Sequence, residues 1–82
     1  MSRYVDSYDI ESQAISLLNA VEELDSQLVL FQGDLDTNDY MREELDWDYM
    51  DVRKTLDKLL HQTKELALDA SSAYDNQDVE EN

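Results

Sequence analysis

The sequence contains no cysteine, no proline and only one glycine, Gly33, among its 82 residues. Without cysteine there can be no disulfide, no thiol nucleophile and no cysteine zinc site. One glycine cannot build a glycine-rich phosphate-binding loop. No alternating apolar and polar run is bounded by turn residues, so nothing in the chain predicts a β-strand. These absences favour an all-α protein.

Long hydrophobic runs are also lacking, since no apolar segment approaches the roughly 18 residues that indicate a membrane-spanning helix. No signal peptide is recognisable, so we expect a soluble protein in the cytoplasm, the host cytoplasm if the chain is phage-encoded, with no membrane partner. Basic residues are few, six against 21 acidic ones, which gives a formal net charge of −15. Because nucleic acids are negative too, this charge argues against direct nucleic-acid binding and favours a basic, nucleic-acid-binding protein as partner.

Apolar residues recur at alternating steps of three and four in two long segments, as along the seam of a coiled coil. The first seam is Ile10, Ala14, Leu17, Val21, Leu24, Leu28 and Phe31; the second is Leu45, Tyr49, Val52, Leu56, Leu59, Thr63, Leu66, Ala70 and Ala73. This spacing predicts one domain over residues 1–74, an antiparallel two-helix hairpin with helices at about residues 8–32 and 37–74. Residues 75–82, which carry four acids and no cation, are predicted to be a disordered tail.

The turn between the two helices is predicted at residues 33–36. Gly33 follows the first helix where a left-handed C-terminal cap favours a residue without a Cβ. Asp36 or Thr37 can accept hydrogen bonds from the free N–H groups that open the second helix.

The second predicted helix is the longer one, and at 1.5 Å per residue its far end would project about 20 Å beyond the first. Leu66, Ala70 and Ala73 would then lack an intramolecular cover, unless the N-terminal segment with Tyr4 and Tyr8 packs against them. Other apolar residues lie off both seams, so a lone hairpin would expose much apolar surface. We therefore expect a homodimer in which two hairpins form a four-helix bundle.

Acidic residues are concentrated between Asp34 and Asp51, where eight carboxylates accompany one cation, Arg42. Tyr40 and Trp47 lie among them at the outermost heptad position of the second helix, so they are predicted to share one exposed stripe. Carboxylates three or four residues apart on a helix are about 5–6 Å from each other, close to the separation of successive backbone phosphates. The predicted partner-binding residues are Asp39, Tyr40, Glu43, Glu44, Asp46, Trp47, Asp48 and Asp51.

The same segment allows a plainer interpretation, in which Trp47 lies in a dimer interface and the acids only keep a small helical protein soluble. Residues 52–64 carry a net charge of +3. If the acidic stripe binds a target, these basic residues would face away from it or contact the acids of a second copy.

Catalytic and metal chemistry find little support. The run from Asp34 to Asn38 resembles the opening of a calcium-binding EF-hand loop, but position six is Asp39 instead of glycine and position twelve is Leu45 instead of glutamate. His61 is the only histidine. A two-helix hairpin offers no sizeable cleft in which a carboxylate could be desolvated. We predict no catalytic residue, no metal and no cofactor, and hence no enzyme.

In size, charge and the acidic stripe up to Asp51, the chain resembles small acidic DNA-mimic proteins of the kind phages encode. That resemblance implies an inhibitor that presents carboxylates where phosphates would bind, for example on restriction enzymes, CRISPR effectors or DNA repair enzymes. It implies no particular fold.

The chain also resembles the WXG family of type VII secretion substrates and their helical partner proteins. Phe31-Gln32-Gly33 stands at the predicted turn, where that family carries Trp-x-Gly, although the tryptophan is missing. Tyr74 and Asp78 are similar to its Tyr-x-x-x-Asp/Glu export signal. This resemblance implies a helical secretion partner or substrate; a phage or plasmid assembly adaptor is a further alternative.

Overall fold

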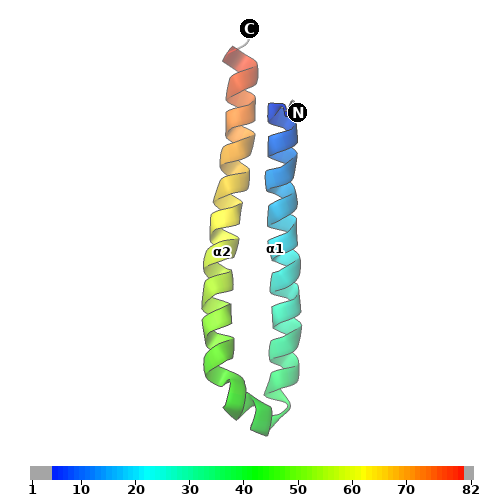
Figure 1. Cartoon of the computed structure of the whole chain (residues 1–82), viewed down its shortest axis with the longest axis vertical. Coiled ribbons are helices and arrows are strands. Elements are labelled where there is room, and N and C mark those ends of the chain that lie inside the picture. The colour runs from blue at the N-terminus through cyan, green and yellow to red at the C-terminus, as the bar shows by residue number, and fades with distance from the viewer. Residues whose placement is uncertain (1–4, 81–82) are drawn as a thin grey trace, which may run out of the picture.

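The computed structural model describes residues 5–80 of the chain. Within this range it contains two helices, α1 (Ser7–Asp36) and α2 (Asp39–Glu80), which lie side by side and antiparallel (Figure 1). The predicted all-α helical hairpin is therefore confirmed. The extents of 62 × 28 × 16 Å correspond to a single layer of two helices. A single layer has only one internal contact line, so each helix keeps most of its circumference on the surface.

The turn lies later in the chain than the sequence predicts. α1 continues through Gly33, whose φ is not positive, and ends at Asp36. Thr37 closes the helix, because its backbone N–H and its hydroxyl both donate to the carbonyl of Asp34, at 3.1 and 2.7 Å. The predicted helix end at residue 32, the turn at 33–36 and the left-handed cap are wrong, since Thr37 supplies the capping hydrogen bonds.

The second helix begins with Asn38 as its N-cap. The Asn38 side-chain oxygen accepts a hydrogen bond from the Met41 backbone N–H at 3.1 Å, which satisfies one of the free donors at the start of α2. The predicted caps, Asp36 and Thr37, instead belong to the end of α1.

The far end of α2 also differs from the prediction, because the helix continues to Glu80. The expected helix end at residue 74 is wrong, and residues 75–80 of the predicted tail are helical. Residues 81–82 lie outside the described part of the chain. No proline or glycine follows Ala73 that would stop the helix. Residues 75–80 extend past the aromatic pair described next, an overhang of about 9 Å at 1.5 Å per residue, shorter than expected.

The open end of the hairpin is closed by two aromatic rings. Tyr8 on α1 and Tyr74 on α2 lie with their ring centroids 6.2 Å apart. Beside them, Ala70 and Ala73 line a hollow shared with the first turn of α1. Ala70 is half-buried, so the expectation that it lacks an intramolecular cover is wrong, whereas Ala73 and Leu66 stay exposed as expected. The alternative of packing against the N-terminal segment holds for Tyr8. Tyr4 lies outside the described residues.

The contact line between the helices follows one heptad row of each predicted seam, which includes Ala14 on α1 and Leu56 and Thr63 on α2, and leaves the other row uncovered. The buried residues are Ala14, Leu35, Leu56, Thr63 and Ala67. The Thr63 hydroxyl is satisfied by the carbonyls of Leu59 and Leu60, at 2.9 and 3.1 Å. In contrast, seven large seam residues expose 40–56% of their surface: Ile10, Leu17, Leu24, Phe31, Val52, Leu59 and Leu66. The apolar arc is wider than one contact line, so its edge stays uncovered.

Candidate functional site

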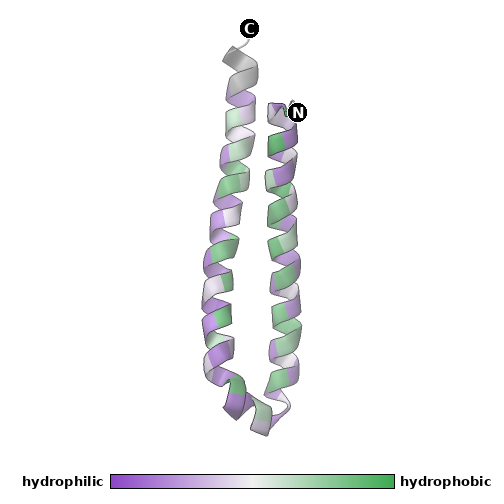
Figure 2. Cartoon of the chain, viewed as in Figure 1, coloured by the Kyte–Doolittle hydropathy of each residue, from purple (hydrophilic) through white to green (hydrophobic). Residues whose placement is uncertain are grey.

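The first turns of α2 carry a hollow surrounded by charge. Asp39, Arg42, Glu43, Asp46 and Trp47 line this open hollow of about 300 Å³, which we call the acidic patch. Figure 2 shows hydrophilic residues predominating in this part of α2. The patch combines three carboxylates with one guanidinium and one indole.

Trp47 and Tyr40 point away from α1. Trp47 exposes 82% of its surface and Tyr40 exposes 71%. They are seven residues apart, which is about two helical turns, so they lie on the same side of α2. The predicted exposure of both aromatic residues is confirmed for the hairpin. Neither ring contributes to the packing of α1 on α2, so both are free to contact another molecule.

Local electrostatics explain why the helix tolerates this acid. Asp39 lies in the first turn of α2, where the partial positive charge of the helix N-terminus stabilises a carboxylate. Arg42 is 3.8 Å from Asp36 at the end of α1, so the cation of the patch is directed back to the turn. Within residues 5–80, Glu43 and Asp46 form no ion pair. Their charge is therefore available to a partner.

The eight predicted partner-binding residues do not form one surface. Asp39, Glu43, Asp46 and Trp47 meet in the acidic patch. Asp48 and Asp51 instead border an apolar groove on another side of the hairpin. Glu44 and Tyr40 are exposed but line neither hollow. The single acidic stripe that the sequence predicts is thus divided between two surfaces.

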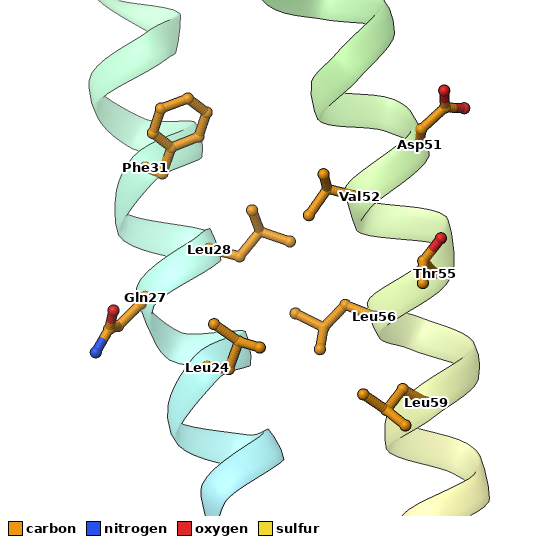
Figure 3. Close-up of a pocket in the computed structure, with 9 residues that line it drawn as sticks. All are labelled: Leu24, Gln27, Leu28, Phe31, Asp51, Val52, Thr55, Leu56 and Leu59. Atoms are coloured by element: carbon orange, nitrogen blue, oxygen red, sulfur yellow. The ribbon is translucent and has the colours of Figure 1, made fainter.

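The apolar groove runs between the two helices and encloses about 450 Å³. Figure 3 shows Leu24 and Leu28 on α1 pointing towards Val52, Leu56 and Leu59 on α2. Gln27, Asp51 and Thr55 lie at its edges. We call the uncovered seam residues the apolar face; they are Ile10, Leu17, Leu24 and Phe31 on α1 and Val52, Leu59, Leu66 and Ala73 on α2.

The basic segment is partly used inside the hairpin. Arg53 forms ion pairs with Asp25 on α1 and with Asp57 on its own helix, the latter at 2.5 Å. Its hydrogen bonds to these carboxylates raise the pKa of Arg53 above the ordinary arginine value. His61 is exposed, and its Nε2 lies 3.7 Å from Oε1 of Glu65. The Arg53 cluster thus joins the two helices and leaves less positive charge on the surface.

Two kinds of feature are not found in the part of the chain that the structure describes. No group of three or more histidine or carboxylate side chains is arranged to hold a metal ion. Neither α1 nor α2 contains a stretch sufficiently apolar and long to span a bilayer.

One sequence motif lies at a different place in the fold than the sequence predicts. Phe31-Gln32-Gly33 lies inside α1, so the prediction that this motif stands at the turn is wrong. The export-signal residue Tyr74 packs on Tyr8 within the hairpin. Comparison with protein-family models, curated proteins and solved structures finds no match, so function is inferred from the two surfaces.

Sequence reasoning missed two parts of these surfaces. Arg42 lines the acidic patch, but it is absent from the predicted partner-binding residues. The apolar face, which is one heptad row of each predicted seam, was expected to lie inside the hairpin with the other row. A signal for its exposure was present, because both helices carry apolar residues over an arc wider than one partner helix can cover.

Proposed function

We propose that this protein is a non-enzymatic acidic binding protein that occupies the basic nucleic-acid-binding surface of another protein. One observation carries the proposal: Trp47 exposes 82% of its surface beside Glu43 and Asp46, which have no ion-pair partner within residues 5–80. Unpaired like charges around an exposed indole do not stabilise a helix. They suit a basic groove that offers cations to the carboxylates and an apolar contact to the ring.

The mechanism is competition for the same cationic groups. Asp39, Glu43 and Asp46 are spaced by four and three residues, so they form a row with separations of about 5–6 Å. Such a row can bind the arginine and lysine side chains that otherwise hold backbone phosphates. Long-range attraction accelerates the encounter, and contacts of Trp47 and Tyr40 slow release. Nucleic acid is excluded while the complex lasts.

The test uses two variants with equal loss of charge. The patch variant is Asp39→Asn/Glu43→Gln/Asp46→Asn. The matched control is Glu22→Gln/Glu23→Gln/Asp69→Asn, which neutralises three exposed acids outside the patch. Immobilised wild-type protein captures targets from lysate at low and high salt. Each captured protein is then purified and bound to labelled DNA, and each hairpin is titrated as a competitor.

We expect wild type and control to displace the DNA, and the patch variant to need a concentration higher by on the order of tenfold to a hundredfold. Displacement by wild type should weaken with salt, because exposed charges are screened. Equal displacement by all three proteins would contradict a role of the acidic patch. If wild type displaces DNA from none of the captured proteins, the proposed function is contradicted.

A second candidate function is favoured by the apolar face, whose large side chains expose 40–56% of their surface. We propose that two hairpins associate into a four-helix bundle through it, or that it receives a helical partner of the type VII secretion or phage assembly kind. Such a partner would be retained at high salt, because apolar burial is not screened by ions. It would also bind the patch variant as well as wild type, which separates the two candidates.

A further inference from the structure

We infer that the apolar face binds a second copy of this chain in antiparallel orientation, with the two-fold axis passing beside Ala20 on α1 and Gln62 on α2. This inference rests on the four-helix association proposed above and specifies its geometry. It is independent of what the acidic patch binds. The consequence is a particle with one acidic patch near each end.

The apolar face is built in regular layers. Ile10 and Ala73 line one hollow together, and Leu24 and Phe31 line the groove with Leu59 and Val52. On each helix, successive members are seven residues apart, so they keep one position around the helix axis. The same register places Leu17 level with Leu66. The result is four layers, each with one residue from α1 and one from α2.

The apolar face is self-complementary: it can pack against a copy of itself that runs in the opposite direction. A two-fold axis halfway along the face places the layer of Leu24 and Leu59 over the partner layer of Leu17 and Leu66. At the ends, Phe31 is placed over Ile10 of the second copy. Val52 is likewise placed over Ala73 of that copy. Larger side chains thus meet smaller ones at both ends, as close packing requires.

The rows that border the apolar face repeat this symmetry. Gln27 lines the edge of the groove on α1, and Gln13 and Ala20 occupy the same heptad position. An axis beside Ala20 places Gln13 opposite Gln27 of the second copy, where the amides can donate and accept hydrogen bonds. On α2 the corresponding row is Thr55, Gln62 and Asp69, centred on Gln62. Five of these six bordering residues are uncharged, as in the central part of protein interfaces.

Charge decides between the two possible two-fold orientations. Residues 34–51 carry eight carboxylates and one cation, a net charge of −7 at the turn end of the hairpin. A parallel arrangement would place two such ends side by side, where like charges repel. The antiparallel arrangement separates them by the length of the bundle. It also places Lys58 near Glu65 and Asp69 of the second copy, since these two acids flank the position that is symmetric to Lys58 about the axis.

The size of the face is adequate for such an interface. From Ile10 to Phe31 it is about 32 Å long, and two helices are about 20 Å wide, which gives an area of about 650 Å². A standard stable interface buries about 800 Å² per partner. An area of about 650 Å² lies within the range of about 600–1,000 Å² per partner that specific interfaces bury.

Disulfide trapping tests the orientation directly, because the chain has no native cysteine. Ala20→Cys is expected to form an intermolecular disulfide under mild oxidation, since the antiparallel axis places it opposite itself. Asn19→Cys, the adjacent exposed position turned away from the apolar face, is the control and should remain monomeric on a non-reducing gel. A nitroxide label on Glu44→Cys should give an inter-label distance of about 55 Å, against roughly 20–25 Å in a parallel dimer.

Light scattering with size-exclusion chromatography tests the face itself. Leu59→Gln and Ile15→Gln change residues with exposures of 40% and 41%, of which only Leu59 belongs to the apolar face. We expect Leu59→Gln to raise the dimer dissociation constant by on the order of tenfold or more, and Ile15→Gln to leave it unchanged. A monomeric wild type, equal trapping of both cysteine variants, or a short label distance would overturn the inference. A monomer that still displaces DNA from a target would leave the proposed function standing.

Discussion

Arg53 on α2 binds Asp25 on α1 across the hairpin, and the same guanidinium also binds Asp57 one turn along its own helix. The side chains of Arg53 and Asp25 are 24% and 30% exposed, so the pair belongs to the helix interface. Its hydrogen bonds to the two carboxylates raise the pKa of Arg53. A raised pKa favours the charged form in the fold, so this stabilisation is fully present below the ordinary arginine pKa and is lost only above it.

Arg53→Met is expected to lower the free energy of unfolding by about 1–2 kcal/mol, because it leaves the part-buried Asp25 carboxylate without its partner. Urea unfolding at neutral pH, followed by circular dichroism at one fixed protein concentration, measures the change. Lys54→Met removes an exposed cation at the next position and should stay within about 0.5 kcal/mol of wild type. Adding Asp25→Asn to Arg53→Met should recover part of the loss. Equal losses in Arg53→Met and Lys54→Met would show that the ion pair contributes nothing.

Gly33→Ala is expected to stabilise the protein by about 0.5–1 kcal/mol, because Gly33 lies inside α1 and alanine is the better helix former. A Cβ at this position meets no atom within 4 Å, so the methyl group fits without strain. Thermal and urea unfolding both measure the gain. Gly33→Asn is the discriminating partner variant: a helix interior favours alanine over asparagine, whereas a left-handed cap tolerates asparagine better. If Gly33→Asn were more stable than Gly33→Ala, Gly33 would form the left-handed cap that the sequence predicts.

Asn38→Ala is expected to lower the free energy of unfolding by about 1 kcal/mol through loss of the N-cap of α2. The Met41 amide, which donates to the Asn38 side chain, should lose protection in hydrogen exchange. Asn38→Asp keeps an acceptor at the same place and adds a charge that the helix N-terminus favours, so both properties should be retained. Unchanged exchange of Met41 in Asn38→Ala would show that another group caps the helix.

The helical hairpin was predictable from the sequence because alternating steps of three and four leave no other regular structure for these segments. The turn was not, because residues 34–38 offer several polar side chains that can cap a helix. Leu35, which is 6% exposed, decides between them. It is buried only if α1 continues past Gly33, so the free energy of burying Leu35 outweighs the preference of glycine for a helix end.

The candidate site was predictable in part. The heptad position of Tyr40 and Trp47 predicted their exposure correctly, since the side opposite a partner helix does not depend on small rotations. Asp48 and Asp51 border the apolar groove instead of the acidic patch, because the contact line includes Ala67 and the pair of Arg53 with Asp25, which lie outside the predicted seams. Periodicity gives the spacing of an apolar arc, and packing decides which part of that arc is covered.

Trp47, the only tryptophan, reports the local charge of the acidic patch. Its indole is 82% exposed among carboxylates, so its fluorescence should be quenched strongly by caesium ions and weakly by iodide, because the negative potential attracts cations and repels anions. Raising the ionic strength with sodium chloride should bring the two quenching constants together.

The patch variant Asp39→Asn/Glu43→Gln/Asp46→Asn should make iodide a markedly better quencher, while the control Glu22→Gln/Glu23→Gln/Asp69→Asn should behave as wild type. Neutral acrylamide, which responds to exposure alone, should quench all three proteins equally. If iodide and caesium quench wild type equally at low salt, the carboxylates do not create the negative field that the proposed function requires. If acrylamide quenches none of them, Trp47 is covered, and the plainer interpretation of the tryptophan as part of a dimer interface gains support.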